Sequence, residues 1–365
     1  MEQSKTLASI WRHLLVLLNR ANANNNPLFV QSATEASAPE ETGVGPRPAQ
    51  LRCGAERRER HHLTSRWGAQ RKGGWRGGRG EDASKWRPAS AGVLRKLEAM
   101  ITVLSTSDEV EQLVLRNTDL TDQLLLIVAD ALKSSSSEVA LLNLNLNLIG
   151  PDGARILLDV LKVKPQVKSL HLFGNRLCDD GALALLSGIA ELQEQTSRAA
   201  AAANLSTGEN FFSLVELDIG GNNLSGVGLK VLASYMRQHS HLQYLGLAQT
   251  GGPDLAAWKE LFDSLKGNDW LTHIILDENN LGDPGVRLLA DVLKSNPRLQ
   301  MVDLDGNHVT DVGGNHLVEA LLCRGHVPMR HLSLAENNIS SGLMRRIREE
   351  VKGKSDRFRD EQCEK

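Results

Sequence analysis

Three polar side chains in the C-terminal part of the sequence are of the types that a hydrolase combines. His331, Ser333 and Asp303 could serve as general base, nucleophile and orienting acid, and a strand would put His331 and Ser333 on one face. The segment around Ser333 has neither a nucleophile elbow nor a recognisable oxyanion hole. The chain also contains no G-x-x-x-x-G-K-S/T phosphate-binding loop. We therefore expect no enzymatic activity, no catalytic residues and no cofactor.

Thiol and metal chemistry have equally little support. The four cysteines, Cys53, Cys178, Cys323 and Cys363, are too far apart for a C-x-x-C zinc or redox motif, and they do not predict a disulfide framework. Calcium takes six to eight oxygen ligands, and neighbouring strands of a flat sheet rarely surround an ion that completely. The sequence therefore predicts no bound metal.

Acidic side chains gather in short apolar segments of the C-terminal half, and they are our candidates for partner binding. Like charges on neighbouring strands repel one another unless they are compensated, so such a cluster indicates a surface for a basic protein partner. The opposite interpretation is a solvated face that binds nothing. The candidate residues are Asp277, Glu278, Asp303, Asp305 and Glu336, with Asp218 farther along and Tyr244 and Phe173 as apolar anchors.

A second candidate for binding lies in residues 51–80, which hold nine Lys or Arg and two Glu. Trp67 and Trp75 are interleaved with these charges, and residues 76–80 read RGGRG. Arginine pairs with phosphate and tryptophan can stack on a base, so association with nucleic acid is an alternative function. A single RGGRG unit is weak evidence, because such boxes normally repeat the unit. We favour a solvated basic linker here.

The elements that position the acidic candidates are repeats. From residue 110 onward the pattern L-x-x-L-x-L-x-x-N-x-L occurs eight times, and all but two of its Asn positions hold Asn, the exceptions being Thr118 and Thr250. The spacing is 28 to 30 residues, except that one spacing of 47 contains an insertion at about 193–211. Self-similarity at this period is the signature of a solenoid. The segments begin at Val110, Val139, Val167, Leu214, Leu242, Leu271, Leu299 and Met329.

Each repeat predicts a short strand, a turn and a helix. The leucines of the strand point into the core, and the Asn of the turn satisfies backbone groups that would otherwise be buried unpaired. The helix pattern is clearest in residues 283–294, where Asp283 can cap the helix and Pro284 fits its first turn. Apolar side chains at i, i+3, i+4 and i+7 from Val286 mark the buried face. Because helices need more room than strands, the stack should bend into a horseshoe with a concave parallel sheet and convex helices.

Residues 91–352 resemble the ribonuclease-inhibitor type of leucine-rich repeat, which also forms the C-terminal sensor regions of NOD-like receptors. The resemblance rests on segments 142–147 (LNLNLN), 170–175 (LHLFGN) and 332–339 (LSLAENNI). It extends to a small repeat protein of this group that lacks a nucleotide-binding domain. It implies an α/β leucine-rich-repeat solenoid that acts as a protein-interaction scaffold, and it carries over no catalytic residue. A regulatory protein of a GTPase is a further alternative, because a GTPase-activating protein of nuclear transport has similar repeats, although its functional loops are not found here.

The ends of the chain differ from the repeats. Residues 1–90 carry 15 Lys or Arg against 8 Asp or Glu, whereas the chain as a whole has a net charge of −2. We predict a disordered, basic, Gly- and Arg-rich region over 21–90 and a charged tail over 353–365. A helix over 94–104 should cap the N-terminal edge of the repeats, with no strand before it, and one over 343–351 should close the other end.

Localisation follows from the first residues and from the lack of long apolar runs. Residues 1–20 predict a short amphipathic helix, and their basic, acid-poor composition makes a mitochondrial transit peptide the alternative to a cytoplasmic location. No segment approaches the roughly 20 apolar residues that a membrane-spanning helix needs. We therefore expect a cytoplasmic monomer without a membrane span, whose partner is another protein.

Overall fold

The computed structural model describes residues 29–32, 91–202, 212–252, 254–324 and 327–363 of the 365-residue chain. The chain divides into two units. Residues 35–90 make up one of them and fall outside the described ranges, whereas the other unit contains every element that follows. The predicted amphipathic helix of residues 1–20 and the basic segment 51–80 also lie outside the described residues.

The described strands form a single nine-stranded sheet whose order follows the sequence. Eight of these strands are parallel, and each belongs to one of the eight predicted repeats, so the predicted α/β repeat solenoid is confirmed. They are β2 (Val110–Val114), β3 (Leu141–Asn143), β4 (Ser169–His171), β5 (Glu216–Asp218), β6 (Tyr244–Gly246), β7 (His273–Ile275), β8 (Met301–Asp303) and β9 (His331–Ser333).

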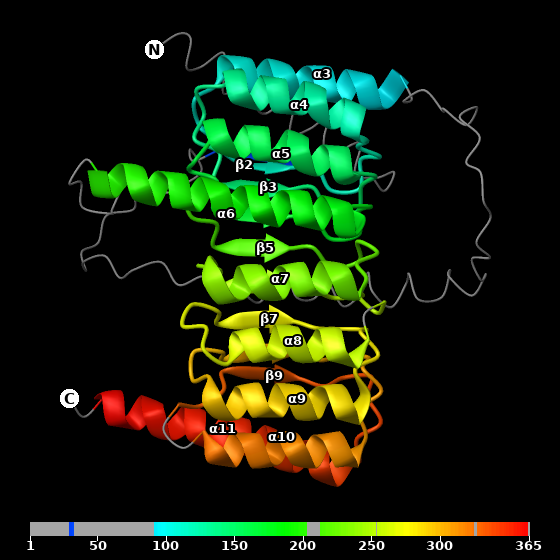
Figure 1. Cartoon of the computed structure of the whole chain (residues 1–365), viewed down its shortest axis with the longest axis vertical. Helices are drawn as coiled ribbons and strands as arrows, with labels where there is room; N and C mark the ends of the chain where they lie inside the picture. The colour runs from blue at the N-terminus through cyan, green and yellow to red at the C-terminus, as the bar shows by residue number, and fades with distance from the viewer. Residues whose placement is uncertain (1–28, 33–90, 203–211, 253, 325–326, 364–365) are drawn as a thin grey trace, which may run out of the picture. The chain divides into compact units, whose positions relative to one another are not determined.

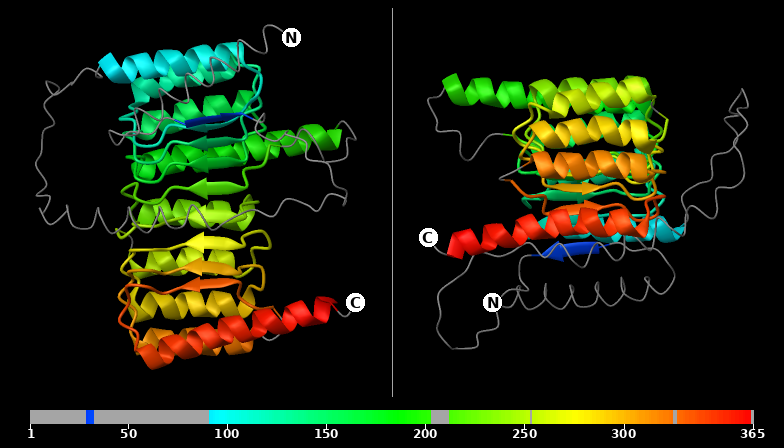
Figure 2. Two further views of the ribbon diagram at one scale, coloured as in Figure 1. Left: turned by 180° about the vertical axis from the view of Figure 1, so that it is seen from behind. Right: turned by 90° about the horizontal axis from the view of Figure 1, so that it is seen from below.

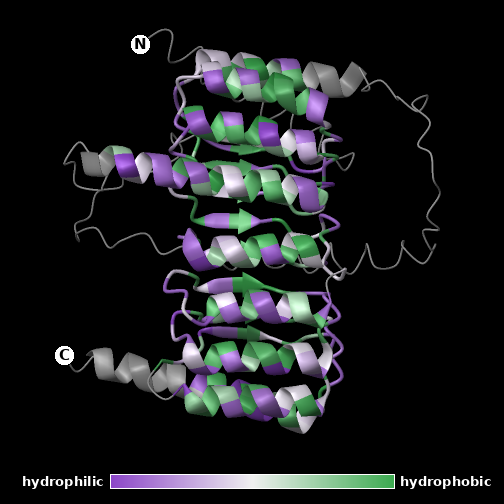
Figure 3. Ribbon diagram, viewed as in Figure 1, coloured by the Kyte–Doolittle hydropathy of each residue, from purple (hydrophilic) through white to green (hydrophobic). Residues whose placement is uncertain are grey.

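The helices of successive repeats stack side by side over one face of this sheet (Figure 1), and the view from behind shows the strands in front of them (Figure 2). Hydrophobic and hydrophilic residues alternate along each helix, as expected for helices with one buried face (Figure 3). The helices are α3 (Ala91–Thr106), α4 (Asp122–Ser134), α5 (Pro151–Val163), α6 (Cys178–Ala202), α7 (Gly226–Gln238), α8 (Leu255–Leu265), α9 (Gly282–Ser295), α10 (Asp311–Cys323) and α11 (Ser341–Cys363).

The core lies between the sheet and the helix layer, and it is built as the repeat pattern predicts. In the repeat of β7, Leu271, Ile274 and Leu276 are fully buried. The apolar side chains of α9 that follow Val286 at helical spacing are buried as well, which confirms the predicted inner face of this helix. Aliphatic side chains therefore fill a thin layer that repeats along the stack.

The Asn of each turn connects neighbouring repeats. The Oδ1 atom of Asn147 accepts hydrogen bonds from the backbone N–H groups of Thr118 (2.9 Å) and Leu120 (3.0 Å), which belong to the previous repeat. Its Nδ2 atom donates to the carbonyl oxygens of Leu115 (2.7 Å) and Leu144 (2.9 Å). This double role is the one that the sequence predicts, and the hydroxyl of Thr250 has no hydrogen-bond partner among the described residues.

The prediction that Asp283 caps its own helix is wrong. Helix α9 begins one residue earlier, at Gly282, and its N-cap residue makes no side-chain hydrogen bond. Asp283 instead faces the next repeat, where its Oδ1 atom accepts from the backbone N–H groups of Thr310 (2.8 Å) and Gly313 (2.9 Å). A Cβ atom on Gly313 would lie 2.6 Å from this oxygen, so the contact needs glycine. Asp122 and Asp179 bind the starts of the following helices in the same way.

Strand β1 (Phe29–Ser32) was not predicted from the sequence. It pairs antiparallel with β2, with Phe29 opposite Val114 and Val30 opposite Leu113. It therefore covers the N-terminal edge of the sheet. The helix predicted over 94–104 is α3, which is longer at both ends. The four residues of this segment, FVQS, show no strand periodicity, and Asn, Ala and Pro are frequent in the sequence around them. Only the pairing with β2 makes this segment a strand.

The insertion extends the helix that precedes it. Helix α6 continues to Ala202 and projects beyond its neighbours (Figure 1). Residues 203–211 lie outside the described residues, and the chain returns with Phe212, whose side chain is buried. At the other end, α11 runs past the predicted closing helix as far as Cys363.

Candidate functional site

The strands carry columns of side chains on the face of the sheet that is turned away from the helices, which we call the sheet face. Within a column, each residue is the direct pairing partner of the next. The middle column runs Val114, Asn143, His171, Asp218, Gly246, Ile275, Asp303 and Ser333, in the register that the sequence pattern predicts. The column before it contains Glu216, Tyr244, His273, Met301 and His331.

The structure brings the C-terminal acidic candidates together. Asp303 is the last residue of β8. Asp277 and Asp305 follow β7 and β8 at equivalent positions of their repeats. The N–H of Glu278, the residue after Asp277, donates to the carbonyl of Asp305 (2.8 Å), so the two positions are adjacent. Glu278 and Glu336 occupy the turns after β7 and β9, both with positive φ. Asp218 lies on β5 and Tyr244 on β6, whereas Phe173 lies in the turn after β4; all three are nearer the middle of the sheet.

Asp303 lies between two histidines from the neighbouring strands. Its Oδ1 atom is 2.9 Å from Nε2 of His331, and its Oδ2 atom is 3.5 Å from Nε2 of His273. Burial by itself would raise the pKa of Asp303, but the contacts with His273 and His331 outweigh burial and hold that pKa well below its ordinary value. Asp303 is therefore ionised at neutral pH.

Asp277 and Asp305 support the backbone of the repeat that follows each of them. The Oδ1 atom of Asp277 accepts from the N–H of Asp305 (2.9 Å), and the Oδ1 atom of Asp305 accepts from the N–H of Ala335 (2.7 Å). Asn145 makes the equivalent bond to Phe173 (2.7 Å), which shows that this position needs an oxygen acceptor and not a charge. Part of the acidic cluster is thus structural.

The environment of Asp277 opposes its negative charge. Burial, followed by the nearby charges of Asp305 and Asp303, raises the pKa of Asp277 to about 8. At pH 7 this carboxyl group is therefore largely protonated. The cluster carries less charge in the free protein than its count of acidic residues indicates.

The acids that remain accessible are the two glutamates of the turns. Glu336 is exposed, and Glu278 is half-buried and accepts a hydrogen bond from Nε2 of Gln249 (3.0 Å). Burial raises the pKa of Glu278, and the charge of Glu336 adds to this effect. These side chains support no backbone group through the contacts described, so they are the acids best placed to meet a partner.

Asp218 is buried. Its Oδ1 atom accepts from the N–H of Gly220 (3.2 Å), and its side chain lies over Gly246, where a Cβ atom would come within 2.5 Å of the same oxygen. Asp218 is only 7% exposed, so it can reach a partner only if its surroundings move.

The three residues with hydrolase chemistry do not assemble into a triad. His331 contacts Asp303, but the hydroxyl of Ser333 donates to Oδ1 of Asp305 at 2.6 Å. A nucleophile needs a base that accepts its proton, and the acceptor here is a carboxylate already bonded to the backbone. The described residues also include no group of three or more His, Cys, Asp or Glu side chains arranged to hold a metal ion.

Sequence reasoning singled out His331 as a candidate base, but it missed that several histidines of the sheet face contact acids of neighbouring strands. Nε2 of His171 is 3.2 Å from Oε2 of Glu216, and the ring of His273 stands edge-on to Tyr244 with centroids 5.0 Å apart. The ring of His171 lies 6.1 Å from that of Tyr244 on the other side. The column that contains Glu216, His273 and His331, compared with the middle column that contains His171 and Asp303, places histidines beside acids of neighbouring strands. Comparing these two columns in the sequence would have revealed the pairs.

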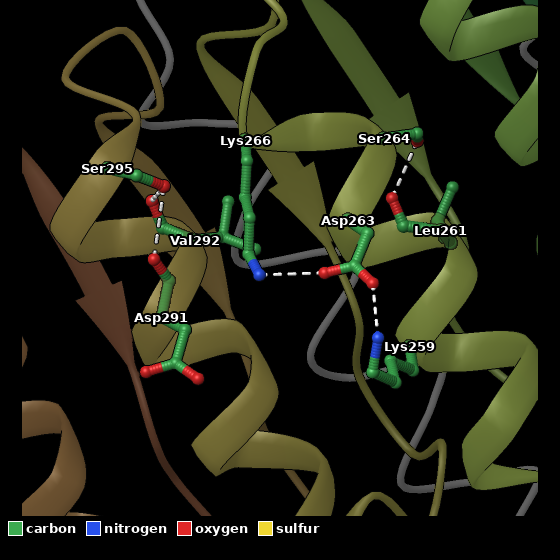
Figure 4. Close-up of polar contacts among 8 residues, drawn as sticks. All are labelled: Lys259, Leu261, Asp263, Ser264, Lys266, Asp291, Val292 and Ser295. Atoms are coloured by element: carbon green, nitrogen blue, oxygen red, sulfur yellow. Dashed lines mark hydrogen bonds and ion pairs between the residues drawn. The ribbon is translucent and has the colours of Figure 1, made fainter.

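The helix layer, in contrast, carries exposed ion pairs between acidic side chains and lysine or arginine. Figure 4 shows Asp263 of α8 between Lys259 and Lys266, at 2.5 and 2.7 Å. The hydrogen bond from Lys259, and then that from Lys266, lowers the pKa of Asp263. Such exposed pairs add little stability. No described helix is both long and apolar enough to cross a membrane.

Comparison with known proteins identifies the repeats. A family model described as "Leucine Rich repeat" matches residues 164–186, 212–233 and 267–290. Human leucine-rich repeat-containing protein 73 is 28% identical over 218 residues, which is 59% of this chain and 63% of the relative. Human NACHT, LRR and PYD domains-containing protein 5 is 32% identical over 40% of this chain and 13% of its own length. Mouse NACHT, LRR and PYD domains-containing protein 3 is 32% identical over 56% of this chain and 18% of its own length. The chain thus spans less than a fifth of these NACHT proteins.

Proposed function

We propose that this chain, which carries leucine-rich repeats homologous to those of leucine-rich repeat-containing protein 73 and of NACHT, LRR and PYD domains-containing proteins, is a non-enzymatic scaffold that binds a protein partner. The partner binds the sheet face, and it is basic where it meets the repeats of β7, β8 and β9. One observation carries the proposal: acids from the repeats of three adjacent strands, β7, β8 and β9, meet on the face turned away from the helices.

The acids of this cluster have two different roles: some support the backbone, and others are accessible to a partner. Asp277 and Asp305 hold the backbone of the next repeat, whereas Glu278 and Glu336 present carboxylates at the rim. Complementary charge mainly raises the rate of encounter and selects among partners, and buried aromatic anchors supply much of the affinity. Tyr244 and Phe173, both half-buried on this face, are the anchors of the proposal.

Proximity labelling of the full-length protein in cells tests this proposal. The variant Glu278→Gln/Glu336→Gln removes the rim charges without removing a side-chain acceptor of the backbone. We expect it to lose a defined subset of labelled neighbours. The matched control Glu191→Gln/Glu319→Gln removes two exposed carboxylates from helices α6 and α10, and it should keep that subset.

Equal loss in both variants, or no loss in either, would contradict the proposal. The same experiment reports the compartment, which we propose is the cytoplasm; neighbours from the mitochondrial matrix would overturn that location. The nucleic-acid alternative concerns residues 51–80, which lie outside the described residues, and it stays a prediction. Recovery of RNA that is lost only when residues 51–80 are deleted would favour it.

A further inference from the structure

Trp270 precedes β7, so it lies at the opposite end of the strands from the turns of Glu278 and Glu336. Its side chain is 50% exposed, whereas Trp258, the other tryptophan of the described residues, is buried. The described part of the chain supplies no hydrogen-bond acceptor for the indole N–H, and the ring meets that of His241 in a T-shaped contact with centroids 4.9 Å apart. A large aromatic side chain with an unused donor therefore lies at the surface.

Hydrogen bonds from buried asparagines fix the backbone at Trp270. The Oδ1 atom of Asn268 accepts from the N–H of Trp270 (3.0 Å), and its Nδ2 atom donates to the carbonyl of Met236 (3.1 Å) in the previous repeat. Asn296 holds the next repeat in the same way, because its Oδ1 atom accepts from the N–H of Arg298 (2.8 Å). Trp270 and Arg298 thus occupy equivalent, ordered positions, and a surface ordered in advance loses little entropy when a partner binds.

Positive charge follows Trp270 on the next two repeats. Arg298 and Arg330 are exposed, and neither guanidinium group forms an ion pair with an acid of the described residues. They belong to neighbouring repeats, since the N–H of Arg330 donates to the carbonyl of Gln300 (2.9 Å), two positions after Arg298. Asp269 is exposed as well, and by number it balances only one of the two arginines.

Arg324 adds a buried charge to the loop of Arg298. It is 8% exposed, and its guanidinium group donates to the carbonyls of Pro297 (3.1 Å) and Leu299 (2.9 Å), on either side of Arg298. Its remaining hydrogen bonds also go to carbonyl oxygens. Burial lowers the pKa of Arg324 to about 10, so the group is still charged at pH 7. The loop therefore holds a cation that pairs with no acid of the described residues, and this favours an anionic ligand nearby.

We propose that Trp270, Arg298 and Arg330 form a second binding surface, the basic rim, which binds an acidic peptide segment of a protein partner. An apolar side chain of the segment packs on the indole of Trp270, and its carboxylates pair with the two guanidinium groups, whose planar donors suit carboxylates. Trp and Arg are enriched among the side chains that dominate binding energy. This inference goes beyond the proposed function, because the chain would then hold a basic partner at one end of the strands and an acidic partner at the other.

The composition of the basic rim favours a peptide over a nucleic acid. Proteins that bind single strands combine a basic groove with several aromatic side chains, on which successive bases stack. The basic rim offers one exposed aromatic ring and two guanidinium groups, and Asp269 lies next to the ring in the sequence. This arrangement suits a short segment with a single apolar anchor better than a strand with a phosphate at every nucleotide.

Photo-crosslinking of the full chain tests the basic rim. The probe is a peptide that alternates glutamate with a photoreactive leucine, and mass spectrometry locates the residues to which it crosslinks. We expect crosslinks within residues 266–272 and 296–300. Trp270→Ala and, separately, Arg298→Glu/Arg330→Glu should reduce these crosslinks at least about tenfold, as expected when a side chain that dominates binding is lost.

Matched controls change exposed side chains of the helix layer. Leu255→Ala removes an apolar side chain that is 46% exposed, and Arg287→Glu/Arg345→Glu reverses two exposed charges on α9 and α11. Both controls should keep the crosslinks at the basic rim. Because all the altered side chains are exposed, every variant should also keep the far-ultraviolet circular dichroism of the native chain.

Three results would overturn the inference. One is the absence of crosslinks at the basic rim, including crosslinks confined to residues 51–80, and another is a set of rim crosslinks that survives Trp270→Ala. Equal losses in the two charge-reversal variants would show attraction to overall charge and not to this surface. If single-stranded polyuridine RNA displaces the peptide from the basic rim, the occupant is a nucleic acid and the proposed class of partner is wrong. None of these results bears on the basic partner of the sheet face, which the Glu278→Gln/Glu336→Gln variant tests.

Discussion

At the scale of single residues, the acidic cluster combines groups with opposite tendencies. Asp303 is stabilised as an anion by two histidines, while Asp277 is forced toward its neutral form by burial and by its acidic neighbours. Both lie in adjacent repeats, and both differ from Asp263, whose carboxylate pairs with two lysines at the helix surface. A count of acidic residues therefore says little about the charge that a partner meets.

The raised pKa of Asp277 makes a prediction about stability. Because the folded protein retains a proton that the unfolded chain releases between about pH 4 and 8, this residue lowers the free energy of unfolding as the pH rises through that window. Asp277→Asn keeps the oxygen that accepts from Asp305 but cannot ionise. We expect the variant to be more stable than the native chain at pH 8 by roughly 1 to 3 kcal/mol, with little difference at pH 4.

Urea unfolding at pH 4, 6 and 8 checks this expectation. Asp263→Asn is the control, because the pKa of Asp263 is lowered and its exposed pairs contribute little. If the native chain and Asp277→Asn show the same dependence on pH, the carboxyl group of Asp277 is not held in its neutral form.

At the scale of elements, side chains that satisfy the backbone of the adjacent repeat hold the stack together. Asn147 does so in the turns, Asp283 at the helix starts, and Asp277 and Asp305 at the ends of strands. Each bond crosses from one repeat to the next, so no repeat is satisfied by itself. This is the physical form of nearest-neighbour coupling in a solenoid.

Asn307→Ala tests this coupling in a single turn. Asn307 is fully buried, donates to the carbonyl of Leu276 (2.8 Å) and accepts from the N–H of Asn279 (3.1 Å). Its loss leaves buried backbone groups unpaired, and we expect the free energy of unfolding to fall by about 2 to 4 kcal/mol. Asn307→Thr should cost less, because Thr occupies the same position at Thr118 and Thr250.

Urea denaturation measures both changes. The exposed helix residue Asn315 offers the control, and Asn315→Ala should change stability by less than about 0.5 kcal/mol. Equal losses for Asn307→Ala and Asn315→Ala would show that the buried amide does not connect the repeats.

At the scale of the whole sheet, the two edges differ. The N-terminal edge is covered by β1, an antiparallel strand that lies 59 positions before the start of α3 in the sequence. The C-terminal strand β9 pairs only with β8 among the described residues. An edge strand with unpaired N–H and C=O groups is a site for unwanted pairing, so covering β2 protects the start of the stack.

Val30→Pro/Gln31→Pro tests the role of β1. In an antiparallel pair, one of two successive backbone N–H groups must point toward the partner strand, and proline removes both. We expect amide hydrogens of β2 and of the start of its repeat to exchange at least about tenfold faster in the variant. Amides of β8 are the internal reference and should not change. Unaltered exchange in β2 would mean that β1 does not cover this edge.

Much of this architecture was readable from the repeats. The positions of the parallel strands, the role of the Asn in the turns and the inner face of α9 all follow from local spacing, because every repeat meets nearly the same surroundings. The register of the middle column from Val114 to Ser333 follows for the same reason. The acids predicted to meet, such as Asp277, Asp303 and Asp305, do lie on or just after the adjacent strands β7 and β8.

The sequence by itself thus determined the class of fold, the count of repeats and the face on which each side chain stands, because these depend on a period that recurs along the chain. Only the tertiary structure decided how the charges behave. Whether Asp283 caps its own helix or the next one, whether Asp277 holds a proton and whether Asp303 pairs with His273 and His331 depend on neighbours about 28 residues away. Burial and pairing depend on distances of a few ångströms between side chains of neighbouring strands, and these distances cannot be derived from the spacing of residues in the sequence.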